Sequence, residues 1–80
     1  MPKLKVLSGN ELIKLFSELG FDIASQRGSH IKLRRVLNNQ KQTLLIPNHK
    51  IIDRGTLKAI IRQSSRYLSA EIINKVFYTD

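Results

Sequence analysis

The sequence predicts an α+β fold in which a helix, three antiparallel strands and a second helix follow one another, with a short third helix at the C-terminus. Three observations carry this prediction. A capping pattern precedes apolar residues at helical spacing near the N-terminus, two alternating stretches flank a Gly-Ser turn signal, and apolar residues return to helical spacing in the last third. Eighty residues fit one domain with a small core, so we expect residues 1–80 to form a single domain.

The first element is a helix of residues 9–19. Ser8 and Glu11 have the spacing of a capping box, and Gly20 supplies a helix end. The apolar residues between these signals recur every three or four positions, as on the buried face of a helix. They are Leu12, Leu15, Phe16 and Leu19.

Phe21–Gln26 and His30–Val36 form the next predicted elements, two strands of a hairpin. A two-residue turn would place Phe21 and Ile23 on the same face as His30, because side chains alternate along a strand. We therefore predict a three-residue loop, Arg27-Gly28-Ser29, which gives the sheet one apolar face. That loop groups Phe21, Ile23, Ile31 and Leu33 on one side and Asp22, Ala24, His30, Lys32 and Arg34 on the other.

A third strand, Gln42–Ile46, follows an Asn38-Asn39 turn and is closed by Pro47, which cannot donate to a ladder. The three strands are then an antiparallel meander. Asp53 caps the second helix and Ser69 starts the third. Their buried stripes are Leu57, Ile60 and Ile61, and Ile72, Ile73, Val76 and Phe77.

Composition restricts the function more than it identifies it. Fourteen basic and six acidic residues give a net charge of +8, which suits a polyphosphate or an acidic protein surface. The chain has no cysteine, and two histidines without clustered carboxylates fall short of a usual metal site, so we expect neither metal nor cofactor. The apolar stretches are too short for a signal peptide or a membrane span, so we expect a cytoplasmic protein without membrane contact.

The second helix carries a basic ridge, which we define as Arg54, Lys58, Arg62 and Arg66 at four-residue intervals. Like charges at this spacing cost an isolated helix about 0.2–0.5 kcal/mol per pair. The ridge is either a solvated face or a docking surface for phosphates or an acidic partner, and the spacing does not separate these alternatives.

A second basic group surrounds the first histidine. His30, Lys32 and Arg34 share the polar face of the second strand, with Arg27 in the adjoining loop. Histidine moves protons near neutral pH, while Lys and Arg hold phosphates, so the group suits cleavage of RNA without a metal. By spacing alone, a histidine after a Gly-Ser turn is more often a surface residue than a catalytic one. His49 either complements His30 or caps local backbone.

Four fragments of the chain, in this order and spacing, resemble the HicA toxin family. They are Leu19-Gly20-Phe21, Arg27-Gly28-Ser29-His30, Ile46-Pro47-Asn48-His49, and Gly55-Thr56-Leu57 leading into Ile60-Ile61-Arg62-Gln63. Together the fragments place the resemblance over residues 8–63. After Gln63 the chain departs from the family, which commonly has a short glycine-containing turn there.

The resemblance implies a fold like a double-stranded RNA-binding domain, cleavage of mRNA, and neutralisation by a HicB-type antitoxin. It also implies that His30 is the catalytic residue. We expect RNA to bind the open sheet face, its adjoining turn and the basic ridge. These expected RNA-binding residues are Arg27, Gly28, Ser29, Lys32, Arg34, His49, Arg54, Lys58, Arg62 and Arg66. The alternative is a basic module of the same fold that binds RNA without cutting it.

Overall fold

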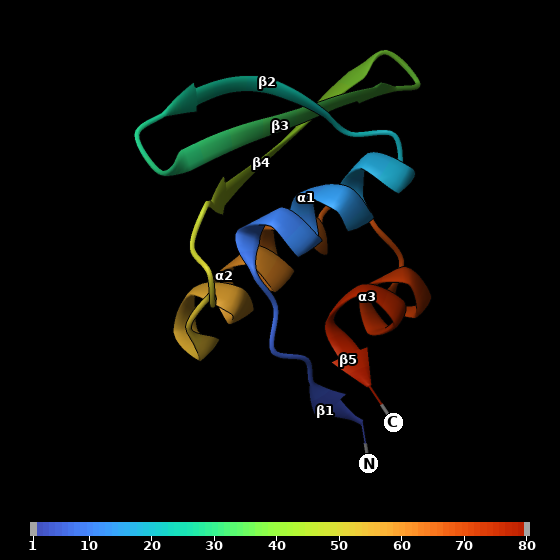
Figure 1. Ribbon diagram of the computed structural model, residues 1–80. Helices are drawn as coiled ribbons and strands as arrows, with labels where there is room; N and C mark the ends of the chain where they lie inside the picture. The colour runs from blue at the N-terminus through green and yellow to red at the C-terminus, as the bar shows by residue number, and fades with distance from the viewer. Residues whose placement is uncertain (1, 80) are drawn as a thin grey trace.

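The computed structural model describes residues 2–79. It contains a three-stranded antiparallel sheet with the three helices on one of its faces (Figure 1). This arrangement confirms the predicted α+β fold. The elements are β1 (Lys3–Leu4), α1 (Gly9–Glu18), β2 (Asp22–Arg27), β3 (His30–Leu37), β4 (Gln40–Pro47), α2 (Arg54–Ser64), α3 (Ala70–Phe77) and β5 (Tyr78–Thr79).

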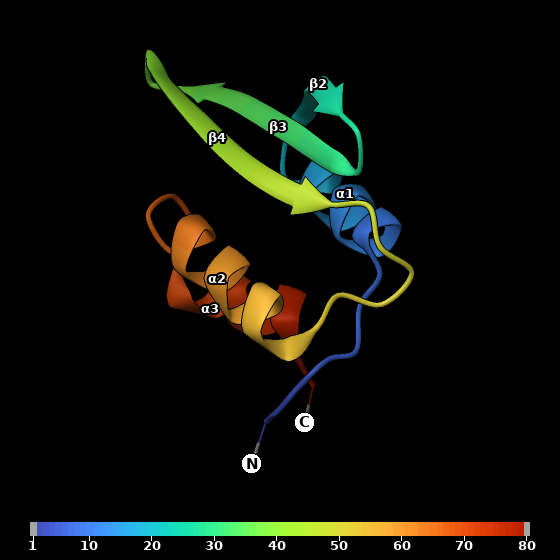
Figure 2. The same cartoon turned by 90° about the vertical axis from the view of Figure 1, so that its left-hand side faces the viewer.

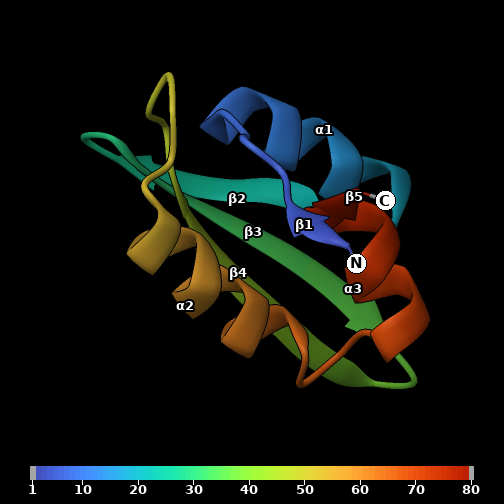
Figure 3. The same ribbon diagram turned by 90° about the horizontal axis from the view of Figure 1, so that it is seen from below.

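The sheet has the strand order β2-β3-β4, and the short strands β1 and β5 pair separately near the two termini (Figures 1 and 3). Viewed from the side, α2 runs beneath β4 while the opposite face of the sheet carries no helix (Figure 2). One sheet face is therefore covered by helices and the other is open.

The capping box at the start of α1 is confirmed. The Glu11 backbone N–H donates to the Ser8 hydroxyl oxygen and the Ser8 N–H donates to the Glu11 carboxylate, each at 3.0 Å. The helix then buries Leu12 and Phe16 completely. The Phe16 ring packs against two other buried aromatic rings, those of Phe21 at 5.7 Å and Phe77 at 6.0 Å between centroids. These contacts join α1, the sheet and α3 in one core.

The predicted three-residue loop between β2 and β3 is wrong. Arg27 pairs with His30, so the turn consists of Gly28 and Ser29 alone, and Gly28 has a φ of +59°. Glycine at the first central position suits a type II′ turn, whose twist matches that of the flanking strands.

A β-bulge at Ala24 explains why the faces nevertheless divide as the apolar pattern requires. The register shifts between Ile23 and Ser25, and the extra residue changes which face the following side chains occupy. Ile23 therefore lies opposite Leu33 despite the shorter turn. Because β2 is an edge strand, Ile23 remains 58% exposed while Leu33 is buried.

The β3–β4 hairpin turns at Asn38 and Asn39, which have φ values of 52° and 64°. Two successive residues in the left-handed region are typical of a type I′ turn, and asparagine tolerates this region better than most residues. β4 ends at Pro47 as predicted but begins two residues before the expected Gln42. Its buried side chains lie opposite those of β3, so Ile31 pairs with Ile46 and Leu33 with Leu44.

Asp53 and Ser69 cap α2 and α3 as the sequence predicts. However, α2 ends at Ser64, so Arg66 lies in the following turn and not on the helix. The hydroxyl of Ser64 donates to the Ile60 carbonyl oxygen and that of Ser65 to the Ile61 carbonyl oxygen. The Ile61 carbonyl oxygen also accepts the Ser65 backbone N–H, so the hydroxyls add to the backbone bonds of the last helical turn.

The segment after β4 is fixed by backbone hydrogen bonds to two distant parts of the chain. It contacts the β2–β3 turn on one side and the start of α1 on the other. A Cβ added to Gly9 would overlap the Pro47 carbonyl oxygen and lie 2.9 Å from the Asn48 Cα. The bonds are Asn48 N–H to Ser29 O at 2.6 Å, Gly9 N–H to His49 O at 2.9 Å, and Ile52 N–H to Leu7 O at 2.9 Å.

Replacing Gly9 with alanine should therefore destabilise the protein, although alanine favours helices. We expect Gly9→Ala to lower the free energy of unfolding by about 1–3 kcal/mol, the usual cost of forcing an extra carbon into a packed site. Urea unfolding followed by circular dichroism measures this change. Gly55→Ala is the matched control in the first turn of α2, where the nearest atom to the new carbon is a side-chain oxygen at 3.3 Å. Equal stability of the two variants would contradict the packing argument.

Acid should weaken the N-terminal caps of α1 and α2, which use carboxylates. Hydrogen bonds from the Ser8 backbone and hydroxyl lower the pKa of Glu11 below its ordinary 4.5, and those from the Thr56 hydroxyl and backbone lower the pKa of Asp53 below 3.8. A carboxylate with a lowered folded pKa stabilises the fold above its unfolded pKa and loses this effect as pH falls through the folded pKa.

The corresponding variant is Glu11→Gln/Asp53→Asn, which keeps capping side chains but removes both titrations. We expect its thermal midpoint to fall less than that of the wild type between about pH 7 and pH 3. Melting curves at several pH values measure the difference. Identical acid sensitivity in the two proteins would show that these carboxylates do not contribute to it.

Candidate nucleic-acid site

His30 is the first residue of β3 and lies in a row of side chains across the sheet. Arg27 is its partner on β2 and Pro47 its partner on β4. Because the Asn48 N–H donates to the Ser29 carbonyl oxygen, His30 and Pro47 form a non-hydrogen-bonded pair, in which side chains come closest. The missing N–H of Pro47 therefore costs no ladder bond at this position.

A hollow of about 530 Å³ on the open sheet face adjoins this row. We call it the sheet hollow. Its cations, Arg27 and Lys32, are exposed, and so is His30. The side chains that line it are those of Ser25, Gln26, Arg27, His30, Lys32 and Leu45. A phosphate in this hollow would lie between positive groups and beside an imidazole that transfers protons.

A second hollow of about 230 Å³ lies between β4 and α2. We call it the edge hollow. The Leu45 N–H, on the outer edge of β4, donates to the Gln63 side-chain oxygen at 3.2 Å and thereby ties the helix to the strand. His30 and Leu45 line both hollows, so the two adjoin. The edge hollow is lined by His30, Leu45, Pro47, His49, Thr56, Ala59, Ile60 and Gln63.

The basic ridge lies apart from both hollows. One face of α2 lines the edge hollow, a second is buried in the core, and a third carries the exposed cations of the ridge. At about 100° per residue, the centre of the ridge is about 130° around the helix from the face that lines the hollow. The three faces consist of Thr56, Ala59 and Gln63, of Leu57, Ile60 and Ser64, and of Arg54, Lys58 and Arg62.

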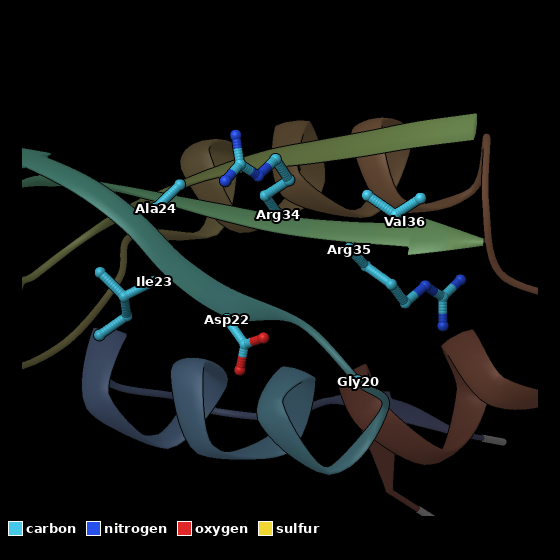
Figure 4. Close-up of a pocket in the computed structure, with 7 residues that line it drawn as sticks. All are labelled: Gly20, Asp22, Ile23, Ala24, Arg34, Arg35 and Val36. Carbon is cyan, nitrogen blue, oxygen red and sulfur yellow. The ribbon is translucent and has the colours of Figure 1, made fainter. Parts of the chain in front are cut away.

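Arg34 belongs to a third hollow of about 360 Å³ near the other end of β2 (Figure 4). It pairs with Asp22 and borders neither of the hollows that His30 lines. The neighbouring Arg35 points toward the helices and is held there by structural bonds. It donates at 2.8 Å to the Leu19 carbonyl oxygen and to the Gln42 side chain, and it lies 4.7 Å from the Phe21 ring centre.

The structure thus brings several predicted site residues together. Those in the β2–β3 turn and at the start of β3 lie near His49, because His30 lines both hollows. Gly28 and Ser29 form the turn itself, and Ser29 fixes the His49 segment through its carbonyl oxygen. Arg34, the helical cations and Arg66 lie elsewhere. Sequence reasoning missed the α2 residues of the edge hollow, although Thr56, Ala59 and Gln63 recur at helical spacing beside the apolar stripe.

Two further observations concern the part of the chain that the structure describes. Among residues 2–79, no three His, Asp or Glu side chains gather where they could hold a metal ion. No helix in the same range has the length and apolar character needed to cross a bilayer.

Comparison with known proteins identifies the family. A family model described as HicA toxin of bacterial toxin-antitoxin matches residues 9–65, a range that contains α1, the whole sheet and α2. No curated protein and no solved structure gave a match. A toxin of this kind has an antitoxin as its partner. Because the match covers more than half of the 80 residues and includes both histidines, the chain belongs to the HicA toxin family of bacterial toxin–antitoxin systems.

Proposed function

We propose that this toxin is an endoribonuclease that cleaves mRNA in the cytoplasm, with His30 as its catalytic residue and without a metal ion. One observation carries the proposal. His30 is exposed at the junction of the sheet hollow and the edge hollow, with Arg27 beside it on β2 and Lys32 two residues along the same face.

The chemistry uses a group that RNA has and DNA lacks. A base takes the proton of a ribose 2′-hydroxyl, the oxygen attacks the neighbouring phosphorus, and the bond to the 5′ oxygen breaks. Negative charge grows on the phosphate during this step, and Arg27 and Lys32 are placed to stabilise it. His30 lies between these cations and the edge hollow, so it is within reach of a phosphate held in either hollow.

The β2–β3 turn supports this arrangement by leaving room for the RNA backbone. A Cβ added to Gly28 would meet nothing within 4 Å, so the turn faces open space. A phosphate can therefore approach the backbone of Gly28 and Ser29 directly. We propose that both residues, together with Arg27 and Lys32, contact the strand that is cut.

The remaining cations extend the proposal beyond the hollows. Arg34, on the same sheet face, would hold RNA farther from the cut. The basic ridge and His49 complete the proposed RNA contacts, with the ridge outside the catalytic hollows. We further propose that a HicB-like antitoxin neutralises the toxin.

Loss of the His30 imidazole should abolish cleavage but not binding. For purified RNA with EDTA present, we expect His30→Ala to cut at least about 10²-fold more slowly than the wild type, since general acid–base catalysis contributes about 10²–10⁴-fold. Gel analysis of the RNA measures the rate, and circular dichroism verifies folding. Val36→Ala, at an exposed position of the same strand, is the matched control.

The other outcomes of this experiment separate the alternatives. If the folded wild type binds RNA but does not cut it, the protein is a binding module and not a nuclease. Equal cleavage by the wild type and His30→Ala would remove His30 from the catalytic role.

Charge reversal should distinguish the ridge from the sheet hollow. We expect Lys32→Glu and Lys58→Glu each to reduce the dependence of log affinity on log salt concentration by about one unit, because each removes a phosphate contact. Only Lys32→Glu should also slow cleavage at saturating RNA, since Lys58 lies outside the hollows. Binding titrations at several salt concentrations and single-turnover rates measure both effects. An unchanged salt slope for Lys58→Glu would exclude the ridge from the RNA site.

A further inference from the structure

We propose that His49 is a second proton-transfer residue and that the edge hollow holds the nucleotide on one side of the cleaved phosphate. This inference rests on the proposed ribonuclease function and assigns a role to the edge hollow and to His49. It follows from the position of His49, the size of the hollow and the polar groups that surround it.

Both histidines line the same small hollow. His30 enters it from the first position of β3, and His49 from the segment that follows β4. A volume of about 230 Å³ is below the range of about 300–1,000 Å³ typical of pockets for drug-sized ligands. A group that fills such a space lies near both imidazoles. A ribose with its phosphate has the appropriate size, whereas several nucleotides do not.

The position of His49 is fixed by backbone bonds that do not involve its side chain. Its carbonyl oxygen accepts from the Gly9 N–H, and the preceding Asn48 N–H donates to Ser29, next to His30. The absence of a side chain at Gly9 allows α1 to approach this segment closely. The fold therefore fixes the backbone positions from which the two imidazoles extend, which contributes to the preorganisation that acid–base catalysis requires.

Two histidines complete the proton balance of the proposed reaction. One neutral imidazole accepts the 2′-hydroxyl proton as the bond from that oxygen to phosphorus forms. The other, in its protonated form, donates a proton to the 5′ oxygen as the bond from phosphorus to that oxygen breaks. The products are a 2′,3′-cyclic phosphate and a 5′-hydroxyl. With a single histidine, water would have to supply one of these transfers.

The other walls of the edge hollow suit a nucleotide. The Gln63 oxygen accepts from Leu45, which leaves the amide nitrogen of Gln63 free to donate. The Thr56 hydroxyl donates to Asp53 at 2.6 Å and retains an accepting oxygen. Ala59 contributes a small side chain and Leu45 a partly exposed apolar one. Donor, acceptor and apolar surface are what a ribose or a base requires.

The first test is the pH dependence of single-turnover cleavage at saturating protein. The wild type should give a bell-shaped profile, because one histidine acts neutral and the other protonated. We expect His30→Ala and His49→Ala each to cut about 10²–10⁴-fold more slowly and to lose opposite limbs of the profile. If His49→Ala retains both limbs and changes only the protein concentration needed for saturation, the inference is wrong.

Two further variants guard against a structural explanation. Asn48→Ala is the matched control, because Asn48 is exposed in the same segment but lines neither hollow. It should retain the wild-type rate and profile. His49→Gln keeps a polar side chain of similar size and should be as slow as His49→Ala if proton transfer is lost. Wild-type activity in a folded His49→Gln would refute the proposal.

An RNA with sulfur in place of the 5′ bridging oxygen shows which histidine acts as the general acid. A thiolate leaves without being protonated, so loss of the general acid no longer slows cleavage of this substrate. This RNA should restore one of the two alanine variants toward the wild-type rate and leave the other slow. Restoration of neither or of both overturns the pairing of the histidines. If the wild type cuts neither RNA, the ribonuclease function itself fails, which is distinct from a wild type that cuts normally without help from His49.

Discussion

The close approach of α1 to the segment after β4 is the constraint on which the site depends. Gly9 packs directly against the backbone of Pro47 and Asn48 and donates to the His49 carbonyl oxygen. The same segment bonds to the β2–β3 turn at Ser29. Three parts of the chain that are distant in sequence thus meet through main-chain hydrogen bonds, and the buried side chains of Leu7 and Ile52 pack at the same junction. The exposed side chain of His49 takes no part in these bonds.

The helices give the sheet two different faces, one packed in the core and one open to solvent (Figure 2). They cover one face of the sheet, where the rings of Phe16, Phe21 and Phe77 join α1, the residue before β2 and α3, so the core needs no contribution from the other face (Figure 2). That face can then carry cations without the cost of burying charge. Arg35 illustrates this difference. It lies on β3 and points toward the helices, where its guanidinium donates to the Leu19 carbonyl oxygen at the end of α1.

Local signals in the sequence predict most of the fold. The capping box at Ser8, the Asn38-Asn39 turn and the caps at Asp53 and Ser69 act within a few residues, so their residue types identify them. The β2–β3 loop length was mispredicted because alternation cannot distinguish a longer loop from a bulge several residues away. Arg66 was placed on α2 because the four-residue spacing of the charges continues past Ser64, where the helix ends. The edge hollow depends on how α2 lies against β4, which no local pattern specifies.

The contribution of α3 extends the core beyond the part of the chain that matches the family model. The region shared with the family ends at residue 65, yet Phe77 is completely buried against Phe16, and β5 pairs with β1. The C-terminal segment therefore packs against α1 through Phe77. A chain of contacts therefore runs from Phe77 through Phe16 and α1 to Gly9, whose N–H donates to the His49 carbonyl oxygen.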